Sequence, residues 1–123
     1  MRDFRKLTIW SQSIDLVLLI YKLTTKFPDS ERFGLQSQMR RAIVSVPSNI
    51  AEGCSRTSQI DFKRFLEISL GSLFELESQL IIVEKLGFID EQELDEMIVK
   101  VSGLQKQTNN LISKIKIENQ SRG

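Results

Sequence analysis

The stretch VSVPSNIAEG (residues 44–53) places a proline inside a sequence that otherwise has the spacing of an α-helix. Apolar residues recur every three or four positions before and within this stretch: Leu35, Met39, Ile43, Val46 and Ile50. Proline in a helix interior removes a backbone hydrogen bond and costs on the order of 3 kcal/mol unless the surroundings compensate. We therefore expect a helix at about residues 34–54 that is kinked at Pro47, with small neighbours that allow close packing.

Three further helices are predicted around this one. Apolar residues at helical spacing indicate helices at about residues 4–26, 58–86 and 90–117, followed by a frayed tail over residues 118–123. In the last helix the spacing alternates between three and four, as in the seam of a bundle: Leu94, Met97, Val101, Leu104, Thr108, Leu111 and Ile115.

Capping signals mark the ends of the third and fourth helices. The Ser58 side chain can cap the third helix at Asp61, and Gly87 is expected to end it in a left-handed conformation. Asp90 and Glu93 form a capping-box pair before the fourth helix. Four helices with short loops predict an all-α fold, a single domain over residues 1–123 built as an antiparallel up-down-up-down four-helix bundle.

The first two helices carry more apolar surface than one bundle seam needs. Helix 1 has one stripe formed by Leu7, Trp10, Ile14, Val17 and Tyr21. A second stripe, centred about 110° around the helix, contains Ile9, Leu16, Ile20, Leu23 and Phe27. Helix 2 likewise adds a stripe of small residues, Val44, Pro47, Ala51 and Cys54.

Composition restricts the possible chemistry. The chain has one cysteine and no histidine, so an intramolecular disulfide is ruled out and the usual zinc and acid–base sites lose their commonest member. We expect no cofactor and no metal, and we expect the protein to be located in the reducing cytoplasm. The longest apolar run, residues 16–21, is far shorter than the roughly 20 residues that span a bilayer, and residues 1–15 do not resemble a signal peptide.

Charge is distributed unevenly along the chain. Residues 1–66 contain 11 basic and 6 acidic groups, whereas residues 67–123 contain 6 basic and 10 acidic groups. This asymmetry fits either a basic surface for an anionic partner or two halves that complement each other within the bundle. Under the first interpretation the candidate nucleic-acid-binding residues cluster around the kink and the following loop: Arg40, Arg41, Arg56, Lys63 and Arg64.

A catalytic interpretation of the proline stretch finds little support. Ser48 and Cys54 are the available nucleophiles, and Glu52 is the one acid nearby. Serine beside a solvated glutamate is not an activated nucleophile, and a lone cysteine is usually a small buried apolar residue. We therefore predict no catalytic residues and no enzymatic activity.

Three segments resemble the 23S ribosomal RNA intervening-sequence proteins, also described as S23 ribosomal protein-like. They are FRKLTIW (residues 4–10), YKLTTKFPDSERFGLQSQMRRAIVSVPSNIAEGCSR (residues 21–56) and FKRFLEISLGSLFELESQLIIVEKLGFI (residues 62–89). The match covers roughly residues 4–115. The part that resembles the family signature consists of Val46, Pro47, Ser48, Asn49, Ile50, Ala51, Glu52 and Gly53.

The resemblance implies a bacterial source, a four-helix fold and ring-shaped homo-oligomers, expected to be pentamers. It also connects the chain to accessory variability proteins of diversity-generating retroelements, in which a basic ring binds nucleic acid and a reverse transcriptase. By this analogy Arg40 and Arg41 would belong to a basic surface.

A ring would also cover the surplus apolar stripes, because exposed contiguous apolar surface usually marks an interface. The residues expected at this contact between copies are Ile9, Leu16, Ile20, Leu23, Val44, Pro47 and Ala51. Two hypotheses follow. The first is a non-enzymatic oligomeric accessory protein that binds RNA or DNA, and the second is a scaffold that binds another protein and no nucleic acid.

Overall fold

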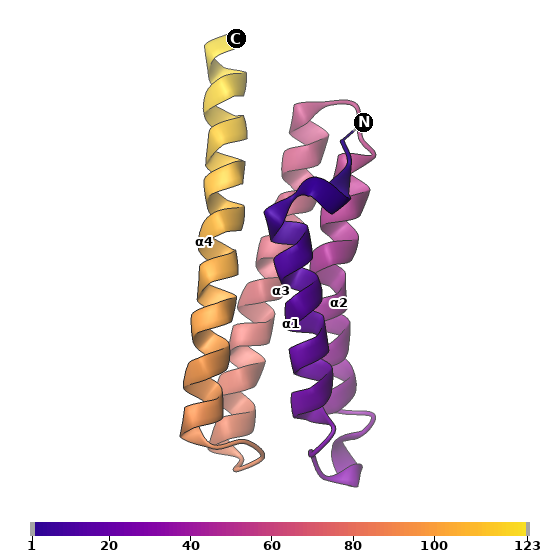
Figure 1. Cartoon of the computed structure of the whole chain (residues 1–123), viewed down its shortest axis with the longest axis vertical. Coiled ribbons are helices and arrows are strands. Elements are labelled where there is room, and N and C mark those ends of the chain that lie inside the picture. The colour runs from indigo at the N-terminus through magenta and orange to yellow at the C-terminus, as the bar shows by residue number, and fades with distance from the viewer. Residues whose placement is uncertain (1, 123) are drawn as a thin grey trace.

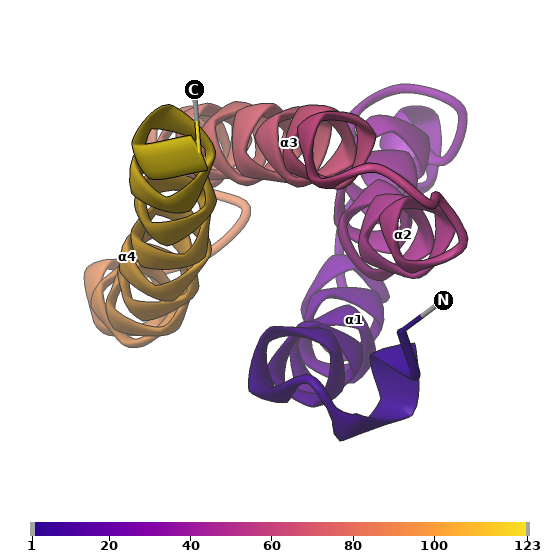
Figure 2. The ribbon, with the colours of Figure 1, turned by 90° about the horizontal axis from the view of Figure 1, so that it is seen from above.

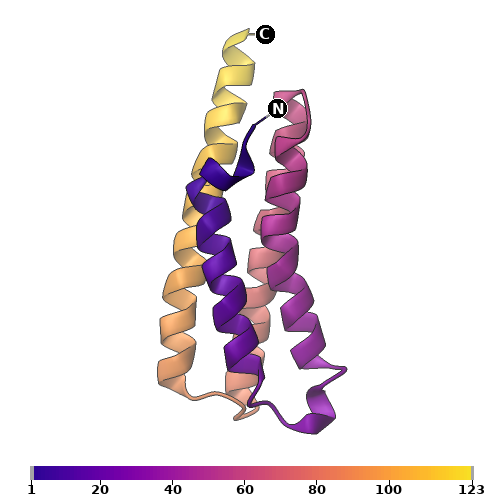
Figure 3. The same ribbon diagram turned by 45° about the vertical axis from the view of Figure 1, so that its right-hand side comes forward.

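Four α-helices run antiparallel to their sequence neighbours (Figures 1 and 3). The computed structural model describes residues 2–122, and at residues 121 and 122 the backbone alone. Two short 3-10 helices complete the order of elements, which is η1 (Phe4–Lys6), α1 (Thr8–Thr24), η2 (Asp29–Glu31), α2 (Leu35–Cys54), α3 (Gln59–Lys85) and α4 (Glu91–Arg122). The predicted all-α four-helix fold is confirmed.

The predicted helix caps are present. The Ser58 hydroxyl accepts a hydrogen bond from the Asp61 N–H at 3.1 Å, and Gly87 has a φ of +82°, in the left-handed region. The Glu93 N–H donates to Asp90 at 2.8 Å, and the Asp90 N–H donates to Glu93 at 3.0 Å. These reciprocal bonds satisfy backbone groups that a helix end leaves without partners.

Two boundaries differ from the prediction. Phe4–Lys6 forms a separate 3-10 turn capped by Asp3, and Leu7 is extended, so α1 begins at Thr8. At the other end of the chain α4 continues to Arg122, so the prediction of a frayed tail from residue 118 is wrong for the residues that the structure describes. This last part of α4 projects beyond the other three helices (Figure 1).

The core lies between the four helices and contains the predicted seam of α4. Met97, Val101, Leu104, Thr108 and Ile115 are all buried, and the Thr108 hydroxyl is satisfied by the Leu104 carbonyl at 2.7 Å. The fully buried side chains of the other helices face them: Ile20 from α1, Met39, Ile43, Val46 and Ile50 from α2, and Leu66, Leu73, Leu76, Leu80 and Val83 from α3.

The second stripe of helix 1 belongs to this core, so the prediction that it is left over for another copy is wrong. Ile9, Leu16, Ile20 and Leu23 are each at most 9% exposed within the single chain. Contact with another copy would require the bundle to open first.

The first stripe of helix 1 and the small-residue stripe of helix 2 are partly covered within the single chain. Bonds from Arg40 to the end of α1 set an antiparallel register in which Val17 lies at the level of Pro47. Val17 is partly buried against the core, Pro47 is buried and Ala51 is half-buried. Of the helix 2 residues predicted at the oligomer contact, Val44 stays the most accessible, at 39% exposed.

Helix α2 continues through Pro47 without interruption, and side chains bond to the backbone carbonyls around the proline. Ser48 donates to the Val44 carbonyl and Asn49 to the Ser45 carbonyl, each at 2.8 Å, while Ser69 of α3 donates to the Val46 carbonyl at 2.9 Å. These bonds strengthen the segment in which proline removes an N–H donor. The kink itself stays a prediction.

Near the end of α2, Gly53 allows α3 to pack very closely. A methyl group on Gly53 would lie 2.9 Å from the Phe65 Cβ and 3.1 Å from the Phe62 ring. Farther along the same pair of helices, the Ser45 and Ser72 hydroxyls are 2.6 Å apart. Small residues thus let the two backbones approach along the whole contact.

Arg40 closes the end of α1. Its Nε donates to the Thr24 hydroxyl at 2.9 Å, one terminal nitrogen donates to the Tyr21 carbonyl at 3.2 Å, and the guanidinium lies 4.5 Å from the Tyr21 ring centroid. A cation at a helix C-terminus bonds to carbonyls that have no intrahelical donor and interacts favourably with the helix dipole. Arg40 therefore has a structural role.

The contact between α1 and α4 is the loosest side of the bundle, as the view along the helices shows (Figure 2). Lys26 pairs with Glu93 at one end, and Gln107 donates to Gln12 at 2.9 Å nearer the other. Between these bonds lies a groove of about 270 Å³, whose lining includes Leu16. Among the described residues, no helix has the length and apolar character needed to cross a membrane.

We predict that Gly53→Ala lowers the free energy of unfolding by about 1 kcal/mol or more, because the added methyl group forces α3 away from α2. Gly103→Ala is the matched control, since its added methyl group meets nothing within 4 Å. It should instead raise stability by about 0.5–1 kcal/mol through helix propensity. Urea unfolding followed by circular dichroism measures both variants, and equal effects would contradict the close packing at Gly53.

We also predict that Arg40→Ala lowers the free energy of unfolding by about 1–2 kcal/mol, because the Thr24 and Tyr21 bonds are lost. Arg41→Ala is the control, since the adjacent Arg41 is exposed and makes no hydrogen bond or ion pair among the described residues; its effect should stay within about 0.5 kcal/mol. Indistinguishable urea midpoints for the two variants would show that Arg40 does not stabilise α1.

Candidate functional site

The structure separates the five predicted nucleic-acid-binding residues into two places. Arg40 and Arg41 lie in the first half of α2, whereas Arg56, Lys63 and Arg64 lie around the connection between α2 and α3. Since the helices are antiparallel, the first pair is nearer the opposite end of the bundle (Figure 1). The prediction that all five form one surface is therefore wrong.

Cations from three other segments join the second group. We call the resulting region the basic end. It consists of Arg2, Arg5, Lys6, Arg56, Lys63, Arg64, Lys114 and Lys116. The acids at the same end are fewer: Asp3, Glu52, Asp61, Glu67 and Glu118.

Ion pairs neutralise part of the basic end. Arg56 pairs with Glu52 at 3.1 Å, Lys63 with Glu67 at 3.7 Å, and Arg5 with Asp3 at 3.7 Å. Exposed pairs of this kind are weak and can exchange for phosphate. Among the described residues, cations of the basic end that make no ion pair are Arg2, Lys6, Arg64, Lys114 and Lys116.

The chain's N-terminal segment is anchored at this end through Arg2. Its backbone N–H donates to the Cys54 carbonyl at 3.1 Å, and its guanidinium lies 4.1 Å from the Phe62 ring centroid. A terminal nitrogen also reaches the Arg56 carbonyl at 3.5 Å. These contacts hold Arg5 and Lys6 near the start of α3, a long-range placement that the spacing of residues in the sequence does not reveal.

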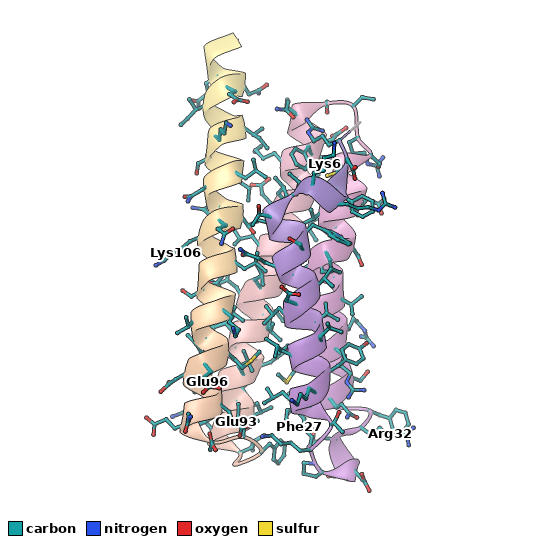
Figure 4. The ribbon with its side chains drawn as sticks, in the orientation of Figure 1. Lys6, Phe27, Arg32, Glu93, Glu96 and Lys106 are labelled. Carbon is teal, nitrogen blue, oxygen red and sulfur yellow. The ribbon has the colours of Figure 1, made fainter. Side chains whose placement is uncertain are left out.

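The opposite end of the bundle is acidic. Figure 4 shows Lys6 near one end and Glu93 and Glu96 near the other. The acidic groups at this foot are Asp29, Glu31, Glu84, Asp90, Glu91, Glu93, Asp95 and Glu96, against six cations, Lys22, Lys26, Arg32, Arg40, Arg41 and Lys85. The near-neutral net charge of +1 therefore conceals a separation of charge along the bundle.

Arg40 and Arg41 line a different feature, which we call the arginine groove. This open groove of about 420 Å³ runs beside α2 and is bounded by Tyr21, Arg32, Phe33, Gln36, Ser37, Arg40, Arg41 and Val44. Sequence analysis did not include Arg32, Tyr21 or Phe33 among the candidate site residues. They come together because η2 folds back beside the first turns of α2.

The signature residues, Val46–Gly53, have mainly structural contacts. Ser48 is turned toward the Val44 carbonyl, and Glu52 is paired with Arg56, so the two do not form a nucleophile and base. Cys54 is 1% exposed, and burial raises the pKa of its thiol, with a smaller opposing effect from Arg2. The thiol is therefore protonated at neutral pH and poorly nucleophilic.

A surface that sequence analysis missed lies on the outer side of α3. Its accessible apolar side chains are Ile60, Ile68, Phe74, Ile81, Ile82 and Leu86, which are 41–56% exposed. Gly71 lies in the middle of this outer face with open space around its Cα. The helical spacing of α3 is apolar on two sides, so the pattern alone did not distinguish the buried side from the exposed one.

Comparison with known proteins agrees with the fold. A search of curated proteins found no match. A crystal structure of a protein of unknown function from the S23 ribosomal protein family of Bacteroides thetaiotaomicron VPI-5482 superimposes with a TM-score of 0.79. The match has 21% sequence identity and covers 85% of this chain and 95% of the other, so it is evidence for the fold alone.

A model of the 23S rRNA-intervening sequence protein family matches residues 5–110, which is most of the chain. This match includes the proline stretch, the α2–α3 connection and most of α4. It agrees with the resemblance found in residues 4–115. The chain therefore belongs to the 23S rRNA-intervening sequence protein family.

Proposed function

We propose that this protein is a non-enzymatic accessory protein that binds RNA or DNA through the basic end. The observation that carries the proposal is the convergence of eight cations on one end of the bundle, against five acids: they come from the N-terminal segment, the α2–α3 connection, the start of α3 and α4. Neutralising phosphates with Lys and Arg releases counterions, which supplies most of the free energy of non-specific nucleic-acid binding.

The charge separation also favours one orientation. The carboxylates around Glu93 and Glu96 repel phosphates, so an approaching nucleic acid is steered away from them and toward cations such as Lys6 and Arg64. The family's name, which refers to sequences within 23S rRNA, is consistent with an RNA target.

Self-association would multiply this small charged area. We propose that copies meet through the outer face of α3, because its apolar side chains are exposed in the single chain whereas the helix 1 stripe is buried. Gly71 would let a second backbone approach closely, as Gly53 does within the chain. A ring of the kind that the family resemblance implies would repeat the basic end several times and so add avidity.

The same face supports a second candidate function, that of a scaffold for another protein with no nucleic-acid role. On this face Phe74 is 56% exposed and Ile68 is 46% exposed, so folding of a single chain leaves both side chains accessible. Exposed apolar side chains gathered on one face of a helix commonly bind protein. The two functions differ in their dependence on salt, because phosphate contacts are screened and apolar contacts are not.

We predict that a gel shift with mixed RNA and DNA detects binding at low salt, and that affinity falls steeply as salt rises. The triple variant Lys6→Gln, Arg64→Gln, Lys116→Gln removes three exposed cations from the basic end. It should weaken binding roughly 10- to 100-fold and reduce the salt slope by about 2–3.

The matched control for this experiment removes the same net charge elsewhere. Lys22→Gln, Lys85→Gln, Lys100→Gln changes three exposed cations away from the basic end and should leave binding within about twofold. Equal losses in the two triple variants would show that net charge, not the basic end, controls binding. The absence of any shift at low salt would remove the nucleic-acid proposal.

We predict that light scattering gives a mass of several chains for the wild-type protein, and that Phe74→Glu with Ile82→Glu reduces it to one chain. Both side chains are substantially exposed, so charge at these positions should disrupt the contact between copies while the helical circular dichroism signal is retained. Leu18→Glu, at an exposed position of α1, is the control and should not change the mass. A monomeric wild type would exclude self-association through this face.

A further inference from the structure

We propose that the arginine groove is a binding site for an unpaired segment of a nucleic-acid strand, with a base stacked on Phe33 and phosphates on Arg32 and Arg41. The proposal rests on the nucleic-acid role proposed above and assigns to it a strand type and a second site. It concerns residues on the side of the molecule nearer the acidic foot, away from the basic end.

Two exposed aromatic side chains border the arginine groove. Phe33 is 89% exposed and Tyr21 is 40% exposed. Base stacking on exposed aromatic rings is the usual device of proteins that bind single strands, because every base has a π-face while a duplex hides it. A ring as open as Phe33 can stack an unpaired base without any rearrangement of the fold.

A guanidinium group lies beside each of these aromatic rings. Arg32 lies 5.7 Å from the Phe33 ring centroid and Arg40 lies 4.5 Å from the Tyr21 centroid, so each exposed ring has an arginine beside it. Guanidinium planes stack on bases as well as on aromatic rings and also bind phosphate in a bidentate manner. A strand laid along the groove would therefore meet aromatic rings on which bases can stack and guanidinium groups that can donate hydrogen bonds to phosphate.

The three arginines of the groove differ in whether they are available to bind phosphate. Arg40 is occupied by Thr24 and the Tyr21 carbonyl, so it forms a fixed wall of the groove. Arg32 and Arg41 are exposed and make no ion pair or hydrogen bond through their side chains among the described residues. The nearby acid Glu31 accepts from the Leu35 N–H at 3.2 Å, which ties its carboxylate to the start of α2.

The groove has a suitable size and is open to solvent. It measures about 420 Å³, within the range of about 300–1,000 Å³ that ligand sites occupy. Arg32 projects away from the bundle near the foot of α2 (Figure 4). An extended strand can lie in such an open groove, whereas a duplex presents phosphates but, away from its ends, no base face to Phe33.

The test compares three probes of about ten nucleotides by fluorescence anisotropy: a thymidine strand, an abasic strand with the same phosphates, and a blunt duplex. We expect the wild-type protein to bind the thymidine strand roughly tenfold more tightly than either other probe. Phe33→Ala should erase this preference and Phe33→Trp should restore it. Because Phe33 is 89% exposed, neither substitution should affect folding.

Leu18→Ala is the matched control, since it removes an exposed apolar side chain of α1 that does not border the groove. It should keep the preference for the thymidine strand. Equal binding of all three probes, unchanged by Phe33→Ala but weakened by the basic-end triple variant, would overturn the groove while leaving the proposed function intact. Failure of every probe to bind at low salt would overturn both the groove and the proposed nucleic-acid function.

Discussion

The close approach of α2 to α3 is the constraint on which the rest of the structure depends. Gly53 leaves no room for a side chain against Phe62 and Phe65, and Ser69 bonds directly to the backbone of α2 at Val46. Pro47 lies within this contact, and Ser69 of α3, Ser48 and Asn49 donate to carbonyls around the proline. The family signature is therefore explained by packing: its small and polar residues fix the distance between two helices.

Fixing α2 on α3 also fixes where charge gathers. The connection between these helices brings Arg56 and Arg64 to one end, and the carbonyl of Cys54 anchors the N-terminal segment beside them. Lys114 arrives at the same end because α4 is antiparallel to α3. An almost neutral protein thus acquires a basic end and an acidic foot without any long run of like charges in its sequence.

The surfaces left uncovered differ in chemistry. The outer face of α3 is apolar and centred on Gly71, which suits contact with another polypeptide. The arginine groove combines Phe33 and Tyr21 with guanidinium groups, which suits unpaired bases and phosphates. A protein that assembles through one surface and binds a strand through others would act by position and repetition. Near the signature, Ser48 and Glu52 make structural bonds and the Cys54 thiol is buried.

The sequence by itself determined the helices, their caps and the core side of α4, because these depend on residues within a few positions of one another, as at Ser58, Asp90 and Gly87. It did not determine which stripe of helix 1 faces the core, since both have helical spacing and only the register of α1 on α2 distinguishes Ile20 from Val17. Nor could it show that Arg40 caps α1, or that Arg2 and Phe33 border candidate sites. Those facts depend on contacts between segments distant in the sequence, which only the tertiary structure decided.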